Sequence, residues 1–185
     1  MVHNSLDSIR CFNIHGKGVP LPDPESVDDL YNLLKKFANK KYYDKAEKVE
    51  RESKPIDPTA NRASCVRLRS IPMIDIIQMI PILKKCFPDL LFRITGHFIY
   101  GPGDFIDTHT NRIDPGDALY INYTTGKSGF DYCIGGINDF TATEDLKGGI
   151  TMRAFSITDR HPFTFHKAYC KEGYRVSIGL RYVEK

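Results

Sequence analysis

The chain has 185 residues, of which 41% are hydrophobic and 26% charged, and this size fits one folded domain. Such a composition excludes an intrinsically disordered chain, which has too little apolar surface to offset the entropy of ordering. The most apolar stretch, residues 71–83, contains Asp75 and Gln78 and is shorter than the roughly 20 residues of a membrane span. The formal net charge of +3 at pH 7 leaves nucleic acid open as a partner without favouring it.

The cysteines and the first residues indicate the compartment. The five cysteines are widely spaced and form no C-x-x-C pair, so neither a zinc ribbon nor a disulfide framework is expected. Residues 1–18 contain no continuous apolar segment of the kind found in secretory signals. We therefore expect reduced thiols, an intracellular, cytoplasmic location and no membrane association.

The first 89 residues are predicted to be mainly helical. Ser26 stands where a helix N-cap is expected. The apolar residues that follow it at helical spacing are Leu30, Leu33, Leu34 and Phe37. The lysine-rich stretch Lys35–Lys54 also contains glutamates, a mixture typical of a solvated helix face. Residues 54–61 are expected to form a loop. A second helix is predicted over Met73–Cys86, kinked or broken near Pro81.

From residue 90 the pattern changes to short strands separated by glycine- and proline-containing turns. The predicted strands are Leu91–Tyr100, Ala118–Tyr123, Asp131–Ile134, Ile150–Ile157, Phe163–Ala168 and Arg175–Tyr182. Many short strands favour a β-sandwich or jelly roll, here an α+β fold with the N-terminal helices packed on one sheet. We expect one domain over 1–185, in which 1–89 is mainly helical and 90–185 is the jelly-roll core.

Polar residues in the strand region suggest a metal site. Asp107, His109 and Asn111 alternate, so in an extended strand their side chains point to the same face. His166 lies on another predicted strand, and Arg175 follows it nine residues later. His161 is the alternative to His166 as the second histidine ligand of the metal. Its Asp-Arg-His-Pro context is typical of a turn, so His166 is preferred.

Together these residues resemble a known pattern. The family of iron(II)- and 2-oxoglutarate-dependent dioxygenases, in its prolyl-hydroxylase-like branch, has a Tyr strand, a Gly-containing turn, H-x-D, Y-L-N, a distal His and an Arg about nine residues later. The matching residues here are Tyr100, Gly101–Asp104, His109–Asn111, Tyr120–Asn122, His166 and Arg175. The closing segment from Gly173 to Tyr182 also looks like the last strand of that family, including its R-x-S form.

The resemblance implies a jelly-roll (double-stranded β-helix) core that binds Fe(II) and uses 2-oxoglutarate and O2 as co-substrates. It implies iron ligation by His109, Asn111 and His166. It also implies that Arg175 binds the far carboxylate of 2-oxoglutarate through two hydrogen bonds. Ser177 is expected to add a hydrogen bond to that carboxylate. Tyr100 and Tyr120 match positions where related hydroxylases place phenols near the co-substrate, and both are equally well explained as core aromatics.

The family normally has Asp where this chain has Asn111. An amide oxygen brings only a dipole to Fe(II), so weaker metal binding is expected. Asp107 is an alternative carboxylate ligand, because position i−2 from His109 also faces the site in a regular strand, and Asp114 is a more distant one. A third interpretation is a degenerate member that no longer turns over.

We therefore expect an oxidoreductase, a hydroxylase that modifies a protein side chain, a small molecule or another substrate with succinate and CO2 as co-products. The basic segment Lys35–Lys54 favours a protein side chain. The alternative is a catalytically degenerate jelly-roll binding protein that keeps the co-substrate pocket. Loops at the barrel mouth, such as Gly126–Gly129 and Gly135–Glu144, are expected to set selectivity.

Overall fold

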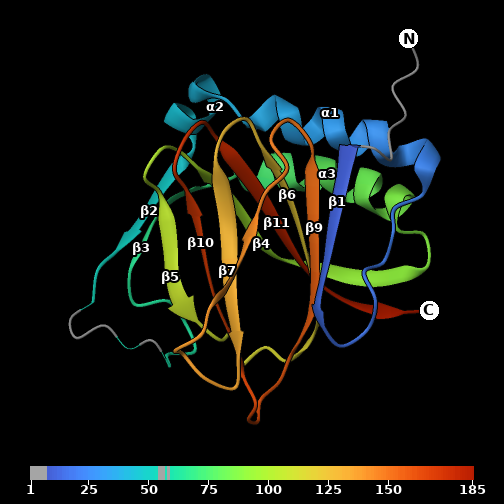
Figure 1. Ribbon diagram of the computed structural model, residues 1–185. Helices are drawn as coiled ribbons and strands as arrows, with labels where there is room; N and C mark the ends of the chain where they lie inside the picture. Colours follow the sequence, from blue (N-terminus) through green and yellow to red (C-terminus); the bar gives the residue numbers. More distant parts are fainter. Residues whose placement is uncertain (1–7, 54–56, 58) are drawn as a thin grey trace.

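One continuous, curled β-sheet forms the body of the protein in the computed structural model, which describes residues 8–53, 57 and 59–185 (Figure 1). The strands follow the order β1-β9-β6-β11-β4-β3-β5-β10-β7-β8, and β2 pairs with β3 outside this path. Their bounds are β1 Ile9–His15, β2 Glu47–Arg51, β3 Val66–Ser70, β4 Leu90–Tyr100, β5 Phe105–His109, β6 Gly116–Thr124, β7 Ser128–Ile134, β8 Thr141–Glu144, β9 Ile150–Ile157, β10 Thr164–Cys170 and β11 Arg175–Glu184.

The sheet folds over itself into two layers. Aromatic rings of β6 and β9 meet rings of β7 and β10 across the interior: Tyr120 lies 5.9 Å from Phe130, and Phe155 lies 5.3 Å from His166 between ring centroids. Strand β3 joins the layers, because its first residues pair with β5 and its last residues pair with β4. This arrangement is the double-stranded β-helix, or jelly roll, that the sequence predicts.

Strand β11 lies at the centre of one layer, between β4 and β6. Its pairing with β6 is one-for-one from Arg175 to Tyr182, so its side chains alternate strictly between the two faces. The apolar residues Val176, Ile178, Leu180 and Tyr182 belong to the core under the helices. Arg175 and the residues at i+2, i+4 and i+6 therefore point to the interior between the layers.

Helices cover the outer face of the layer that contains β11, as expected (Figure 1). The helical segments are η2 Pro24–Ser26, α1 Val27–Phe37, α2 Lys40–Lys45 and α3 Met73–Cys86. Leu30 and Leu34 of α1 and Met79 and Leu83 of α3 are buried against apolar side chains of β6, β9 and β11. A separate apolar cluster that includes Phe130 and Phe155 lies in the interior between the layers.

The first 89 residues contribute more strand than predicted. β1 adds a parallel strand next to β9, β2 and β3 pair antiparallel, and β3 is part of the main sheet. The prediction of a solvated helix face for Lys35–Lys54 is wrong for its second half: in the described part of this segment α1 ends at Phe37, α2 covers only Lys40–Lys45, and strand β2 follows. β2 is exposed apart from Val49, so its charges face solvent in an edge strand as they would on a helix.

Two other expectations about the N-terminal part have different outcomes. α3 continues through Pro81 to Cys86 instead of breaking. Pro81 and Ile77, its i−4 residue, are both exposed, so the hydrogen bond that Pro81 cannot make lies on the solvent side of the helix. Of the loop predicted at 54–61, residues 54–56 and 58 lie outside the described residues. The six strands predicted from Leu90 onward are all present, and β6, β7 and β11 are longer than predicted. β5 and β8 are additional strands that the prediction does not include.

Two further predictions concern cysteines and membranes. All five cysteines are free thiols, as the spacing predicts, and Cys86, Cys133 and Cys170 are buried. Within the described residues no helix is long and apolar enough to cross a bilayer.

Candidate functional site

A cavity of about 450 Å³ lies between the two layers of the sheet. The interior face of β11 forms one wall through Arg175, Ser177, Gly179 and Arg181. One end is closed, since the Arg175 side chain there is completely buried, whereas Ile113 at the other end is 68% exposed. The cavity therefore has a buried end at Arg175 and an open end near Ile113 and Arg181.

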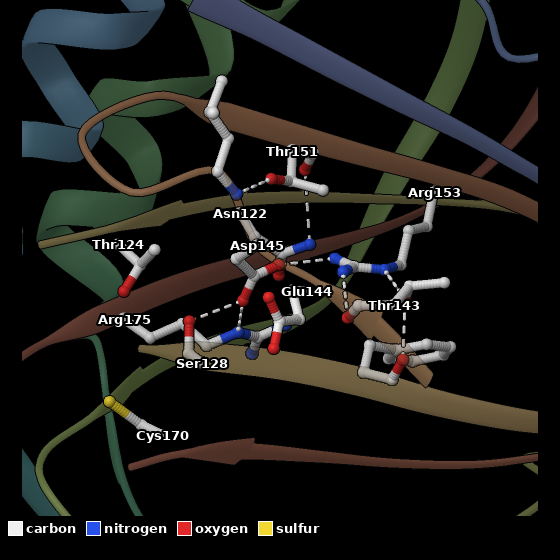
Figure 2. Close-up of polar contacts among 12 residues, drawn as sticks. Asn122, Thr124, Ser128, Thr143, Glu144, Asp145, Thr151, Arg153, Cys170 and Arg175 are labelled. Carbon is white, nitrogen blue, oxygen red and sulfur yellow. Dashed lines mark hydrogen bonds and ion pairs between the residues drawn. The ribbon is translucent and has the colours of Figure 1, made fainter. Parts of the chain in front are cut away.

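A network of buried charges closes the inner end (Figure 2). Asp145, just after β8, accepts hydrogen bonds from Arg153 Nη1 at 2.6 Å, Arg175 Nε at 2.7 Å and Ser128 Oγ at 2.7 Å. Arg153 also donates through Nε to Thr143 Oγ1 and through Nη2 to the Thr143 carbonyl, both at 2.8 Å. Each of the three guanidinium nitrogens of Arg153 thus has a protein partner.

Arg175 differs from Arg153 because its two terminal nitrogens, Nη1 and Nη2, are buried and have no hydrogen-bond partner in the described structure. Only its Nε bonds to Asp145, and the guanidinium lies 4.9 Å from the centre of the Tyr100 ring. A buried cation without a full set of partners is costly. Asp145 supplies one negative charge for two buried guanidinium groups, so this end of the cavity is matched to a bound anion.

The charge state of Asp145 follows from its neighbours. Burial by itself would raise its pKa, but the guanidinium groups of Arg175 and Arg153 and the Ser128 hydroxyl together hold that pKa well below the usual value. Asp145 is therefore ionised at neutral pH. Burial raises the pKa of the adjacent Tyr100 phenol to about 12, so Tyr100 stays neutral and can serve as a hydrogen-bond donor.

The two histidines of the expected metal site lie side by side. β5 and β10 pair so that His109 and His166 are directly opposite, with ring centroids 4.2 Å apart. His109 Nδ1 donates to the Asp107 carbonyl at 2.7 Å, and His166 Nδ1 donates to the Thr164 carbonyl at 3.1 Å. A carbonyl only accepts, so both Nδ1 atoms carry the proton and both Nε2 atoms are unprotonated and carry a lone pair.

Both imidazoles are neutral at pH 7. Burial lowers the pKa of His109 to about 4, and burial together with the neighbouring His109 lowers the pKa of His166 well below its ordinary value. A neutral imidazole whose other nitrogen is held by a backbone carbonyl is the usual form of a histidine metal ligand.

Asn111 lies next to this pair at the end of β5. Its Nδ2 is 3.2 Å from His166 Nε2 and 3.3 Å from the Tyr120 hydroxyl. Asn111 has a positive φ of 56°, a left-handed conformation that Asn and Asp adopt more readily than other side chains. Since the two atoms of an amide are interchanged by rotation, the same position can also present Oδ1. His109, His166 and Asn111 are therefore brought together.

Asp107 is placed elsewhere, contrary to the argument from alternation. On β10, His166 and Ala168 are two residues apart, but their partners on β5, His109 and Ile106, are three apart. The extra residue is a bulge, which breaks the alternation between Asp107 and His109. Asp107 lines a separate hollow of about 280 Å³ and does not line the main cavity. The premise that it faces the same site as His109 is therefore wrong.

The remaining residues from the sequence analysis divide into two groups. Tyr100, Tyr120 and Ser177 line the cavity, and Asp114 lies at its open end. His161 is exposed and its Nε2 donates to the Gly135 carbonyl at 2.9 Å, away from the cavity. Gly126–Gly129 and Gly135–Glu144 contribute no lining residue, so the expectation that they form the mouth is wrong for this cavity. Asn61, Arg62 and Ile113 form part of its wall instead.

Sequence reasoning missed Asp145 and Arg153. Arg153 is the one charged residue in the run Ile150–Ile157, and all but one residue of that strand is buried. A charged residue inside a run buried on both faces predicts a buried partner. That signal was present in the sequence, but it does not identify Asp145 as the partner.

Known proteins offer only distant likenesses. No family profile and no curated protein matches the chain. Among solved structures, an oxidoreductase of the 2OG-Fe(II) oxygenase family from Burkholderia pseudomallei is 11% identical over 86% of this chain and 79% of its own, with a TM-score of 0.45. A Pseudomonas putida prolyl-4-hydroxylase is 12% identical over 90% of each chain, with a TM-score of 0.46. A predicted oxalate decarboxylase from Thermotoga maritima is 12% identical over 77% and 96%, with a TM-score of 0.33. Values this low carry no functional argument.

Proposed function

We propose that the protein is an Fe(II)- and 2-oxoglutarate-dependent oxygenase that hydroxylates a protein side chain or a small molecule entering the cavity. The observation that carries this proposal is Arg175, whose two buried Nη atoms lack partners beside the cavity. A guanidinium fork matches a carboxylate with two parallel hydrogen bonds. A bound carboxylate would also balance the second buried guanidinium of the Arg153–Asp145–Arg175 network.

The donor set suits a divalent iron at His109 and His166. Both Nε2 lone pairs are free of protons, and neutral imidazoles are good ligands for Fe(II). The third donor would be the amide oxygen of Asn111 after rotation of its side chain. Among the described residues no group of three or more His, Cys, Asp and Glu is placed to hold a metal ion, so the proposed set depends on this amide.

Each residue has a defined part in the proposed activity. Arg175 anchors the far carboxylate of 2-oxoglutarate, and Ser177, at i+2 on the same face, supports it with its hydroxyl. Tyr100 closes the buried end with a neutral phenol, and Tyr120 positions Asn111 through its hydroxyl. Bound Fe(II) and O2 would supply the oxidative decarboxylation of 2-oxoglutarate to succinate and CO2, coupled to hydroxylation of the substrate.

A second candidate function is a binding protein that holds 2-oxoglutarate without turnover. It is favoured by Asn111, which brings no negative charge and already donates toward His166 Nε2. The two candidates agree on the Arg175 site and differ only at the metal.

Anaerobic titration of the protein with Fe(II) and 2-oxoglutarate tests the proposal. We expect a visible metal-to-ligand charge-transfer band, followed by succinate release when O2 is admitted. Absence of the band, with 2-oxoglutarate still bound, would favour the binding protein, and so would a band without succinate. No band and no calorimetric binding of 2-oxoglutarate would contradict both candidates.

A further inference from the structure

Strand β2 lies at the outer margin of the sheet (Figure 1). It pairs with β3 along its whole length, from Glu47 with Ser70 to Arg51 with Val66, and has no second strand partner in the described structure. Every second residue of an antiparallel strand directs its N–H and C=O to the same edge. The outer edge of β2 therefore carries main-chain donors and acceptors that no neighbouring strand satisfies.

Of the strands that pair with a single neighbour in the described structure, β2 alone reaches the main cavity. The other two are β1 and β8, and no described residue of either lines the cavity wall. Their edges lie close together, since Arg10 Nη1 of β1 donates to the Glu144 carbonyl of β8 at 3.4 Å. In contrast, Arg51 of β2 lines the cavity and donates through Nη2 to the carbonyl of Ala63, which lines the same wall, at 2.6 Å. The unpaired edge of β2 therefore lies beside the cavity.

The two faces of β2 differ. Val49 is partly buried and packs against the interior cluster that includes Phe130, and Arg51, two residues later in a regular pairing, belongs to the same face. Lys48 and Glu50 point the other way, are more than half exposed and form an ion pair with each other. A strand added beside β2 continues this alternation. Every second side chain of the added strand therefore points to the side of Val49 and Arg51, toward the cavity.

We infer that the outer edge of β2 binds an extended segment of a polypeptide substrate, one side chain of which enters the cavity. The main chain of an extended segment presents N–H and C=O groups at the spacing of the unpaired edge, and a small molecule has no such repeat. β2 has five residues, so the added ladder is short and suits a substrate that leaves after reaction. The inference rests on the proposed function only in calling this polypeptide the substrate.

Hydrogen exchange of the metal-free protein, resolved by residue with NMR, tests this assignment. The probe is a random mixture of capped heptapeptides at millimolar total concentration, because main-chain bonds are common to all its members. We expect the fast-exchanging amides of β2 to slow by roughly threefold or more. The edge amides of β1 and β8 are the matched controls and should not change. The same mixture with every amide N-methylated keeps its side chains but has no N–H to donate, and it should slow none of these amides.

The outcomes separate the inference from the proposed function. Unchanged exchange in β2, equal slowing in β1 and β8, or equal slowing by the N-methylated mixture would overturn the inference. With Fe(II), 2-oxoglutarate and O2 present, we expect the unmodified mixture to increase succinate release and the N-methylated mixture to leave it unchanged. Slowed exchange in β2 of a protein that never turns over 2-oxoglutarate would refute the proposed function alone. Succinate release that both mixtures increase equally would overturn the inference alone.

Discussion

The two halves of the cavity are built by different means. At the buried end, Arg175 is held by Asp145, and Asp145 is held by Arg153 and Ser128, so side chains from distant strands fix one another. At the histidine pair, each imidazole is held by a backbone carbonyl two residues earlier in its own strand. The charged end therefore depends on tertiary packing, and the neutral end depends mainly on local strand geometry.

Because of this difference, substitutions in the two halves should affect folding stability and ligand binding to different degrees. Removing one charge from the buried network leaves other charges uncompensated, so the effect is on folding as well as on binding. Removing an imidazole takes away a neutral group that has no ion pair, so metal binding should suffer more than folding. The following predictions test this contrast, from the largest expected effect to the smallest.

The largest effect is expected from Asp145→Asn. It leaves the guanidinium groups of Arg153 and Arg175 buried without a countercharge, and we expect a loss of about 3–5 kcal/mol in the free energy of unfolding, measured with urea. Asp44→Asn, which breaks the exposed ion pair with Lys40, is the control and should change the free energy of unfolding far less, because solvent screens that pair. Equal effects in the two variants would show that the buried network does not stabilise the fold.

Lowering the pH should destabilise the metal-free protein first through the buried histidine pair, His109 and His166. The folded-state pKa of His109 is about 4 and that of His166 lies well below its ordinary value, so between pH 6.5 and 4 the unfolded chain binds protons that the folded chain does not. Stability is then lost as the pH falls, by about 3 kcal/mol for His109 at pH 4. Because the pKa of Asp145 is also lowered, its contribution remains intact above pH 3.8.

Urea denaturation of the metal-free protein at several pH values measures this loss. In His109→Gln the dependence on pH should become shallower, since one buried titrating group is removed. A free energy of unfolding that is constant from pH 7 to 4 would contradict neutral, buried histidines.

Metal binding should depend on the two paired histidines. We expect His109→Ala and His166→Ala each to weaken Fe(II) binding by roughly a hundredfold or more. Removal of a residue that only hydrogen-bonds to a metal ligand typically costs less, and here the ligand itself is lost. The exposed His161 provides the control, and His161→Ala should leave most of the affinity. Loss of metal in His161→Ala instead would reverse the assignment of the distal ligand.

The smallest effect is expected at the third donor. Asn111→Asp adds a negative charge without changing side-chain size, and Asp also tolerates the left-handed conformation at this position. We expect tighter Fe(II) binding, on the order of tenfold, and more succinate released from 2-oxoglutarate. Asp107→Asn should leave Fe(II) affinity nearly unchanged. Loss of iron in Asp107→Asn, with no gain in Asn111→Asp, would overturn the choice of Asn111.

Sequence patterns predict the local features of this molecule well. The alternation in β11 identifies a strand with Arg175 and Ser177 on one face, and no distant contact is needed to recognise it. In contrast, the partner of Arg153 is set by the path of the β8–β9 connection, which no periodicity describes.

The bulge in β5 is a second feature that sequence patterns do not predict. Asp107 and His109 share a face only if the strand is regular, and the extra residue becomes visible only when β5 is paired with β10. The charged segment from Lys35 shows a third limit, since an exposed edge strand and an exposed helix have the same composition. The histidine pair is expected from the resemblance, in which a distal histidine follows the H-x-D motif and precedes an arginine by about nine residues.

The central claim is that Arg175 anchors 2-oxoglutarate, and calorimetric titration of wild-type protein and Arg175→Lys with 2-oxoglutarate tests it most directly. We predict a loss of affinity of about tenfold in Arg175→Lys, because a point charge does not replace the bidentate fork, with Fe(II) affinity nearly unchanged. Arg93→Lys, on the neighbouring strand and outside the cavity, should bind 2-oxoglutarate like the wild type. Equal affinity in wild-type protein and Arg175→Lys would contradict the claim, and Arg181 and Lys127 would become the next residues to test.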